Sequence, residues 1–220
     1  DHFARVNTAL TRGVPIVKVG VIHPVERFWL HWGPNDKSGL IREELDKNFQ
    51  DLTKWLLFGS IDFDFISESL LPGLCPHADA PLRVGEMKYD VIVVPGCETL
   101  RSSTLDRLEK FREDGGRVIF LGEAPTLEDA QPSDRGERLF KNSEHIPYQR
   151  ASLLTALDRS RTVCIRDDDG YLSDGLIYQL REDTDSLWLF VAHAVEPYDC
   201  NITNFDDRNT TVKGGYRAVI

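Results

Sequence analysis

The chain has 220 residues, of which 41% are hydrophobic and 28% are charged, a composition that is ordinary for a globular protein. Its length suits one domain with an appendage better than two full domains. The formal net charge of −10, with no cluster of Lys and Arg, argues against nucleic-acid binding. No apolar run approaches the roughly 18 residues of a membrane span, so we expect no membrane partner.

The chain contains four cysteines: Cys75, Cys97, Cys164 and Cys200. Their spacing fits neither a zinc ribbon nor a dense disulfide framework, so we expect reduced, mostly buried thiols and favour a cytoplasmic location. Two Asn-x-Thr triplets, at Asn201 and Asn209, would matter only in a secreted eukaryotic protein. The chain has no signal peptide or initiator Met and ends in an apparent strand, so we expect a piece of a larger protein.

The first half of the chain begins a pattern of strand and helix. Residues 1–13 are typical of a short helix that ends at Gly13. The run "IVKVGVI" (16–22) is almost continuously apolar, as in a strand that is covered on both faces. A long helix should follow and end at Gly59, because apolar residues recur at helical spacing: Ile41, Leu45, Phe49, Leu52 and Leu56.

The pattern continues with a strand at 63–67, a proline-rich loop at 72–84 and a strand at 89–96. A helix is predicted over 103–114, with Ser103 and Asp106 as a capping box and "DGG" (114–116) as its stop. The remaining elements are a strand at 117–122, a polar and broken stretch at 123–147, a helix at 151–159 and a fifth strand at 162–167.

After residue 167 the pattern changes to strands joined by hairpin-like connections: "GLIYQLRED", "SLWLFVAH" and "TTVKGGYRAVI". Strand–helix alternation makes a parallel sheet with helices on both faces. The predicted fold is therefore α/β, a flavodoxin-like three-layer sandwich with a mainly parallel sheet, plus a β-rich C-terminal tail. The predicted domains are 1–13, the end of a preceding domain or a linker helix; 14–166, the sandwich; and 167–220, the tail.

Two loops of this fold should meet at one place. In open parallel sheets, ligands bind beyond the carboxyl ends of the strands where the strand order reverses. For the order 2-1-3-4-5, this point lies between the first and third strands, whose loops are "HPVERFWLHWGPND" (23–36) and "PGCETL" (95–100). The loops would place Cys97 and Glu98 opposite four residues: Arg27, Trp29, His31 and Trp32. The alternative is that the aromatic residues plug the end of the sheet or contact a neighbouring domain.

The chemistry of these residues suits ligand recognition. Aromatic rings stack on the faces of sugars, and arginine and carboxylate groups form hydrogen bonds with hydroxyls. Glu68, after the second strand, either joins the same rim or lies at a solvated helix start.

A catalytic alternative uses Cys97 as a nucleophile with His23 or His31 as its base. The turn lacks the G-x-C-x-G pattern of a nucleophile elbow, and a free Cys is commonly a small buried hydrophobe. Cys75 and His77 have no companion pair at zinc-site spacing, and "RDDDG" (166–170) lacks the later Glu of a calcium loop. No G-x-G-x-x-G follows the first strand, so we expect no cofactor and no metal.

One stretch carries a family resemblance. "YDVIVVPGCETLRSSTLDRLEKFREDGGRVIFLGEAP" (89–125) combines an apolar strand, a helix and "GGRVIFLG". It resembles class I glutamine amidotransferase-like domains, in particular the β-galactosidase trimerisation-like domain of multidomain, bacterial-type glycoside hydrolases. The stretch "HFARVNTALTRGVPIVKVGVIHPVERFWLHWGP" (2–34) resembles the junction where a barrel domain of such an enzyme meets this domain. The resemblance covers about residues 1–166.

The resemblance implies a non-catalytic role. True amidotransferases carry a nucleophilic Cys just after the strand that follows "GG", and here that position falls at or near Glu123. In the glycosidase relatives the barrel supplies the catalytic acids, and the accessory domain assembles subunits and walls a neighbouring active site. The implied partners are other domains of the same polypeptide, carbohydrate, or a second copy in a homo-oligomer. Two alternatives stay open: an independent hydrolase or transferase that uses Cys97, and a small-ligand-binding flavodoxin-like module.

Overall fold

The computed structural model of the chain describes residues 2–194 and 215–220. Internal contacts divide the chain into two compact units. The sheet unit consists of residues 17–56 and 63–160, and the tail unit of residues 1–16, 57–62 and 161–220. Cys200, Asn201 and Asn209 lie outside the described residues. Within the described part of the chain, every helix is too short or too polar to cross a membrane.

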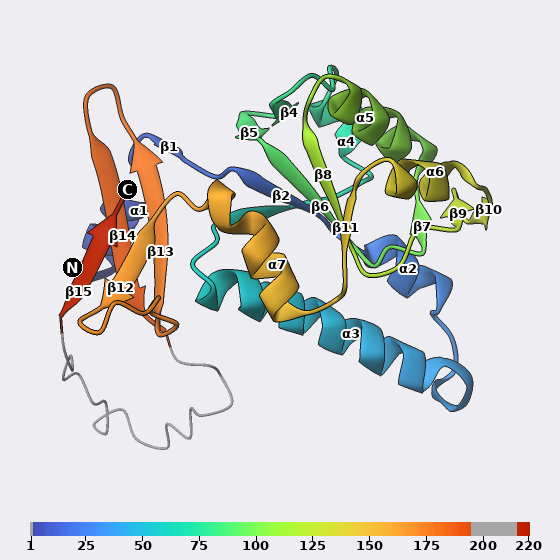
Figure 1. The fold of residues 1–220 in the computed structure, drawn as a ribbon, viewed down its shortest axis with the longest axis horizontal. Helices are drawn as coiled ribbons and strands as arrows, with labels where there is room; N and C mark the ends of the chain where they lie inside the picture. The colour runs from blue at the N-terminus through green and yellow to red at the C-terminus, as the bar shows by residue number, and fades with distance from the viewer. Residues whose placement is uncertain (1, 195–214) are drawn as a thin grey trace. The chain divides into compact units, whose positions relative to one another are not determined.

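The sheet unit is built on five parallel strands in the order β11-β8-β6-β2-β3 (Figure 1). Their bounds are Val19–Ile22 (β2), Phe63–Ile66 (β3), Val91–Pro95 (β6), Arg117–Leu121 (β8) and Glu144–Ile146 (β11). In chain order this arrangement is 2-1-3-4-5, so the predicted topology is confirmed. The central strands β2 and β6 are buried at every residue, which explains their nearly continuous apolar sequence.

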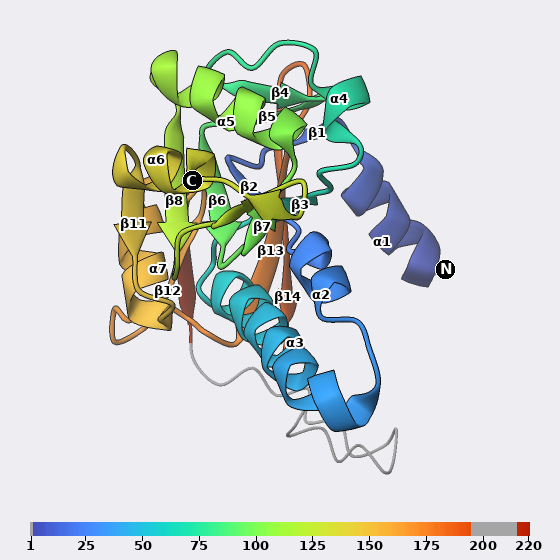
Figure 2. The ribbon, with the colours of Figure 1, turned by 90° about the vertical axis from the view of Figure 1, so that its right-hand side faces the viewer.

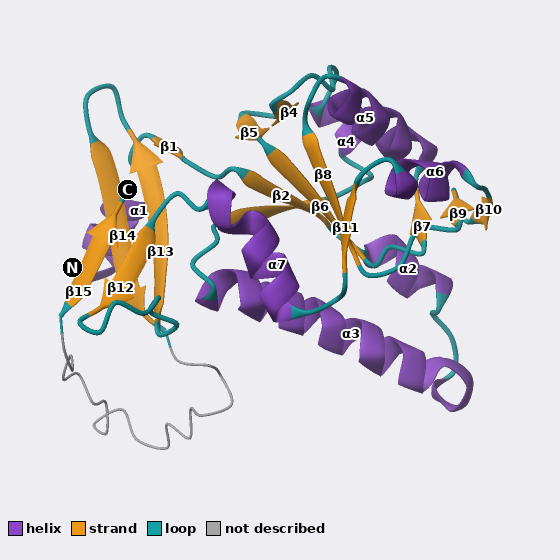
Figure 3. Cartoon of the chain, viewed as in Figure 1, coloured by secondary structure: helices purple, strands orange, loops and turns teal. Residues whose placement is uncertain are grey.

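Helices cover both faces of this sheet (Figures 1 and 3). Their bounds are Val25–Leu30 (α2), Asn35–Phe58 (α3), Leu71–Leu74 (α4), Ser102–Glu113 (α5), Arg135–Lys141 (α6) and Arg150–Leu157 (α7), which a short 3₁₀ helix, Asp158–Ser160, continues. Figure 2 shows α4 and α5 on the face opposite α3. The predicted inward residues of α5, Leu105, Leu108 and Phe111, are all at most 1% exposed and pack in one cluster with the sheet. The three-layer prediction is therefore confirmed.

Two smaller sheets flank the main one. The strands Leu82–Val84 (β4) and Met87–Tyr89 (β5) form a hairpin within the region predicted as a loop. The strands Thr99–Leu100 (β7), Leu127–Glu128 (β9) and Gln131–Pro132 (β10) form a sheet in the order β10-β9-β7. The second sheet ties the segment after β6 to the segment after β8, near the carboxyl edge of the main sheet.

Three local predictions are wrong. The fifth parallel strand is β11, within the stretch predicted to be broken, because Glu144–Ile146 pairs with β8 despite its polar composition. The stretch predicted as strand 162–167 instead belongs to the tail unit, where Cys164–Asp167 (β12) pairs antiparallel. The loop at 23–36 contains the helix α2. This helix has no buried residue, so its sequence lacks the apolar periodicity from which a helix is predicted.

The prediction for the C-terminus of α5 is confirmed, and the prediction for its N-terminus is wrong. Its C-terminus is a Schellman motif, as "DGG" indicates: Gly116 N–H donates to the carbonyl of Phe111 at 2.8 Å and Gly115 N–H to that of Arg112 at 3.0 Å. Its N-terminus lacks the predicted capping box, because the helix starts at Ser102 and has no cap from its own side chains.

The tail unit is mainly antiparallel. Strands Val14–Pro15 (β1), Leu176–Glu182 (β13) and Leu187–His193 (β14) form one sheet, and β12 pairs with Tyr216–Val219 (β15). The helix His2–Thr11 (α1) also belongs to it, and its small core contains Val163, Ile165, Leu176 and Leu180. The antiparallel C-terminal strands confirm the β-rich tail. The predicted boundaries at residues 13 and 166 stay predictions.

Candidate functional site

The carboxyl edge of the main sheet brings together the segments after β2 and after β6. His23 and Pro24 follow β2, and Pro95 and Gly96 end β6, and all four line one cavity. β2 and β6 are neighbouring parallel strands on either side of the point where the strand order reverses. We call this edge the rim.

A polar cluster links α2 to the end of β6. Arg27 Nη1 donates a hydrogen bond to the Gly96 carbonyl at 2.6 Å. Glu98 Oε2 lies 2.7 Å from His31 Nε2 and 3.8 Å from Arg27 Nε. Glu98 therefore contacts both Arg27 and His31 of the α2 segment, and all three side chains are partly buried. The structure therefore brings three of the predicted rim residues into direct contact: Arg27, His31 and Glu98.

Glycines make this approach possible. Gly96 has a φ of +52° and Gly122, after β8, a φ of +95°, values that side chains other than glycine rarely adopt. A Cβ at Gly96 would lie 3.3 Å from Arg27 Nη1, and one at Gly122 would lie 3.3 Å from the ring of Tyr148. Both turns therefore need glycine, for their backbone conformation and for the side chains that press against them.

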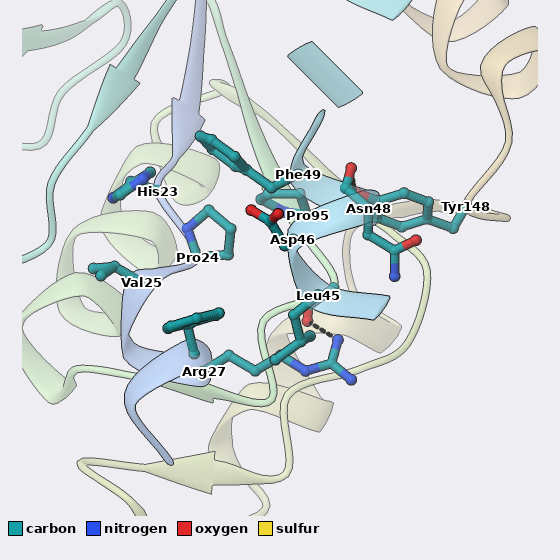
Figure 4. A pocket seen from close by; sticks show the side chains of 12 residues that line it. His23, Pro24, Val25, Arg27, Leu45, Asp46, Asn48, Phe49, Pro95 and Tyr148 are labelled. Carbon is teal, nitrogen blue, oxygen red and sulfur yellow. Dashed lines mark hydrogen bonds between the residues drawn. The ribbon is translucent and has the colours of Figure 1, made fainter. Parts of the chain in front are cut away.

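The rim cavity between α2 and α3 has a volume of about 220 Å³ and is walled mostly by apolar side chains (Figure 4). Leu45 and Phe49 of α3 face Pro24 and Val25 across it, and the aliphatic part of Arg27 crosses its floor. Tyr148 closes one side: its hydroxyl donates to the Asn48 carbonyl at 2.8 Å, and burial raises its pKa. The cavity is smaller than the roughly 300–1,000 Å³ of drug-sized sites, so it suits about one ring.

Cys97 lies beneath the rim rather than on it. It is 2% exposed, and its thiol lies 3.8 Å from the Pro95 carbonyl. Burial, with a smaller contribution from the charge of Glu68, raises the pKa of this thiol well above its usual value. Among the described residues, no hydrogen bond joins it to a histidine: His31 pairs with Glu98, and the His23 ring packs against Phe49 at 5.2 Å. The arrangement lacks the base and the thiolate that a cysteine nucleophile needs.

The exposed aromatic residues lie on different sides of α2. Trp29 is 58% exposed and Trp32 is 68% exposed. Trp32 lies beside Phe28, with ring centroids 5.9 Å apart, and under the Arg42 guanidinium at 5.0 Å. Trp29 instead lines a second hollow with Thr99 and other residues beyond β6. Neither tryptophan plugs the end of the sheet.

Glu68 is not a solvated helix start. It is 1% exposed, and its Oε2 accepts a hydrogen bond from the Arg101 backbone N–H at 2.8 Å, just before α5. Burial raises its pKa from 4.5 to about 7, and the Arg101 N–H and the Thr104 hydroxyl only partly oppose that effect. At the start of α5, a carboxyl from the segment after β3 thus accepts from Arg101, and Asp129 Oδ1 accepts from the Ser102 N–H at 3.1 Å. The Arg101 side chain in turn pairs with Glu26 of α2 at 2.8 Å.

Sequence reasoning missed several rim residues. Glu26, Arg101 and Asp129 line the second hollow, and Asn48 and Tyr148 line the cavity. Asp129 lies in a turn whose two central residues have positive φ, a feature that "LEDAQP" signals only weakly. Glu123, the predicted remnant of a nucleophile position, is exposed. Across residues 2–194 and 215–220, no three His, Cys, Asp or Glu side chains are grouped as a metal site would require.

Two comparisons with known proteins find no match, and a third finds a distant structural neighbour. No family model matches the chain, and no curated protein matches it. Among solved structures, the chain is similar to a cold-adapted β-galactosidase from Rahnella sp. R3, with 15% identity and a TM-score of 0.37. The match covers 81% of this chain and 24% of that chain, so the chain spans about a quarter of that protein. One distant structural neighbour is thus a β-galactosidase, and the resemblance to glutamine amidotransferase-like domains stays a prediction.

Proposed function

We propose that the chain is a non-catalytic accessory module of a multidomain glycoside hydrolase, and that it assembles domains or subunits through its rim. The observation that carries the proposal is the composition of the rim surface. There, α2 has no buried residue, Trp29 on α2 and Trp32 just after it are exposed, and the cysteine is enclosed. The link to glycoside hydrolases rests on the sequence pattern of residues 89–125.

The contacts of the polar rim residues are better explained by a structural role than by a catalytic one. Glu98 holds His31 and Arg27 together, and Arg27 also binds a backbone carbonyl. Each of these groups fixes α2 against the sheet. A general base needs a free lone pair within reach of a substrate proton, and a nucleophile needs an adjacent base. Cys97 has no adjacent base among the described residues, and His31 engages the Oε2 atom of Glu98.

An apolar surface lies where α2 meets the start of α3. We call it the apolar rim patch, and it consists of Phe28, Trp32, Leu40 and Arg42. Leu40 is 83% exposed, and it lines a shallow hollow with Phe28 and Arg42, beside the polar residues Asn35, Glu43 and Asp46. Large exposed side chains that gather in this way commonly mark contact surfaces, because their burial contributes about 25 cal/mol per Å². This patch is where we place the contact with another domain or subunit.

The first test concerns assembly of the natural protein that carries this chain. Trp32→Ala combined with Leu40→Ala removes two exposed side chains of the patch, so the fold should persist while association weakens by at least about tenfold. Sedimentation velocity over a range of concentrations measures association, and limited proteolysis reports on contacts between domains. A matched control replaces Tyr171 with Ala, since Tyr171 is 73% exposed and belongs to the tail unit. Unchanged association in the double variant would remove the basis for the proposed contact.

The second test concerns the thiol. Because Cys97 is enclosed and its pKa is raised, we expect iodoacetamide at pH 7.5 to alkylate it at least about 100-fold more slowly in the folded chain than in urea. Mass spectrometry of peptides quantifies each cysteine separately, and the less buried Cys164 serves as the internal control. Alkylation of native Cys97 faster than that of free cysteine would instead support a catalytic thiol.

A further inference from the structure

Two carboxyl groups are enclosed where α2 meets the start of α5. Glu68 is 1% exposed, and the side chain of Glu26 is 12% exposed. Both accept from Arg101 at 2.8 Å: Glu68 Oε2 from its backbone N–H and Glu26 Oε1 from its Nε. The second oxygen of each acid, Glu68 Oε1 and Glu26 Oε2, is buried without a hydrogen-bond partner among the described residues. One arginine therefore serves two acids, and each acid keeps one unpaired oxygen.

The charges of this group do not balance when both acids are ionised. One guanidinium then faces two carboxylates, and an enclosed carboxylate oxygen without a donor is destabilising. Burial, with the like charge of Glu26 as a smaller contribution, raises the pKa of Glu68 from 4.5 to about 7. A proton on Glu68 leaves one carboxylate for one guanidinium. The pair of acids is therefore most stable when Glu68 holds a proton.

The other charged and titratable groups near the pair do not correct this imbalance. Arg27 of α2 donates to a backbone carbonyl, and its Nε lies 3.8 Å from Glu98. Asp129 of the β9–β10 turn lines the same hollow as Glu26 and adds negative charge. Cys97 is enclosed, and burial raises the pKa of its thiol well above its usual value, so it adds no cation. Within the described part of the chain, Arg101 is the cation that bonds to the two acids.

The helix α2 is the element that can respond to a change of charge. It has no buried residue, and polar contacts hold it: Glu26 bonds to Arg101, and Arg27 bonds to a backbone carbonyl. Elements with few buried contacts open most readily. Glu68, in contrast, is buried and bonded to a backbone N–H. When Glu68 loses its proton, Glu26 is therefore the acid that can move out to water, and α2 moves with it.

We propose that Glu26 and Glu68 form a pH-sensitive switch, which keeps α2 docked while Glu68 is protonated and loosens α2 when Glu68 is ionised. The proton passes to the solvent. Because the docked state binds this proton more tightly than the open state, docking is fully favoured at low pH and is lost as the pH rises through about 7. The inference deepens the proposed function and rests on it for its consequence: Phe28 of α2 belongs to the apolar rim patch, so loosening of α2 should weaken association.

Hydrogen exchange of the full 220-residue chain, followed by mass spectrometry of peptides, measures how often α2 opens. After correction for the intrinsic exchange rate at each pH, protection of residues 25–32 should fall at least about fivefold between pH 5.5 and 8.5. The strand β8 in the sheet core is the internal reference. The opening of α2 is local as long as this helix exchanges faster than β8 at each pH.

Four variants identify the groups that are responsible. Glu68→Gln and Glu26→Gln each remove one charge and keep an acceptor oxygen for Arg101, so each should reduce the change in protection to less than about twofold. Glu123→Gln is the matched control, since Glu123 is exposed and its substitution should leave the full change in place. His31→Gln tests the contact of His31 with Glu98, because histidines titrate in the same pH range, and it should also leave the change in place.

Several outcomes would overturn the inference. Protection of α2 that is constant with pH, or no lower than that of β8, contradicts a local switch. A change that persists in either Glu68→Gln or Glu26→Gln contradicts the pairing of these two acids. A change that disappears only in His31→Gln assigns the pH response to the contact between His31 and Glu98.

Failure of the proposed function is a separate result, because exchange of α2 is measured on the chain by itself and association on the natural protein. Sedimentation velocity of the natural protein at pH 6 and 8.5 should show weaker association at the higher pH, and Glu68→Gln should remove the difference. A switch that is seen by hydrogen exchange, with association that does not change with pH, contradicts only the role of the apolar rim patch. Weaker association at high pH without a change in the exchange of α2 contradicts only the switch.

Discussion

Replacing Glu68 with Gln is expected to stabilise the sheet unit by about 3 kcal/mol at pH 8. Glu68 is 1% exposed, and burial raises the pKa of its carboxyl from 4.5 to about 7. The folded chain must therefore ionise a buried acid at pH 8, at a free-energy cost that the unfolded chain avoids. Gln keeps an acceptor oxygen for the Arg101 N–H and carries no charge, so it removes this cost.

The pH dependence has a definite sign. Between pH 4.5 and 7 the folded chain holds a proton on Glu68 that the unfolded chain has lost, so this group makes stability fall as the pH rises. Below pH 4.5 both states are protonated, and the variant should match the wild type. Above pH 7 both states are ionised, and the advantage of the variant should be constant.

Urea unfolding of both proteins at pH 4, 6 and 8 measures this difference. Glu123→Gln is the matched control, because Glu123 is exposed and its substitution should change stability by less than about 0.5 kcal/mol at each pH. A Glu68→Gln variant that is less stable than the wild type at pH 8 would show that the ionised carboxylate stabilises the start of α5.

Gly116→Ala is expected to destabilise the sheet unit by about 3 kcal/mol. A Cβ at this position would lie 2.2–2.4 Å from three atoms of the Phe111 ring. Phe111 is fully buried in the main cluster under the sheet, so its ring has no free space into which to move. The expected cost is at the upper end of that for overpacked cores because an aromatic ring, rather than a flexible chain, must be displaced.

The neighbouring glycine provides a control with a different physical origin. Gly115 has a φ of +91°, but no atom lies within 4 Å of the Cβ that Ala would add. Gly115→Ala should therefore cost only the backbone strain, roughly 1–2 kcal/mol. Thermal unfolding of the two variants separates packing from backbone strain. A loss of stability in Gly116→Ala that is no larger than in Gly115→Ala would indicate that the Phe111 ring shifts aside at little cost.

These two positions bear on the rim through α5. Glu68 accepts from Arg101 at the start of this helix, and the Arg101 side chain binds Glu26 on α2. A buried acid that titrates near neutral pH is therefore linked by two contacts to the helix that carries Trp29. The stability measurements report on the same framework that shapes the second hollow beside Trp29.

The amino-acid sequence by itself predicted four of the five strands of the parallel sheet, β2, β3, β6 and β8, and the end of α5. The buried strands β2 and β6 are nearly continuous apolar runs, and Gly115 supplies the left-handed position that a Schellman motif requires. Such signals are local, since each depends on residues that are close in the chain. They also predicted correctly that the segments after β2 and β6 meet.

Only the tertiary structure decided the rest. The strand β11 and the helix α2 have too few buried residues to show a period, and contacts with distant segments hold them in place. At the start of α5, Glu68 and Asp129 accept from the backbone in place of Ser103, and Cys97 is enclosed while Trp29 is exposed. Burial and pairing between distant residues set these outcomes, because the energy of a polar or aromatic side chain depends on which neighbours the completed fold provides.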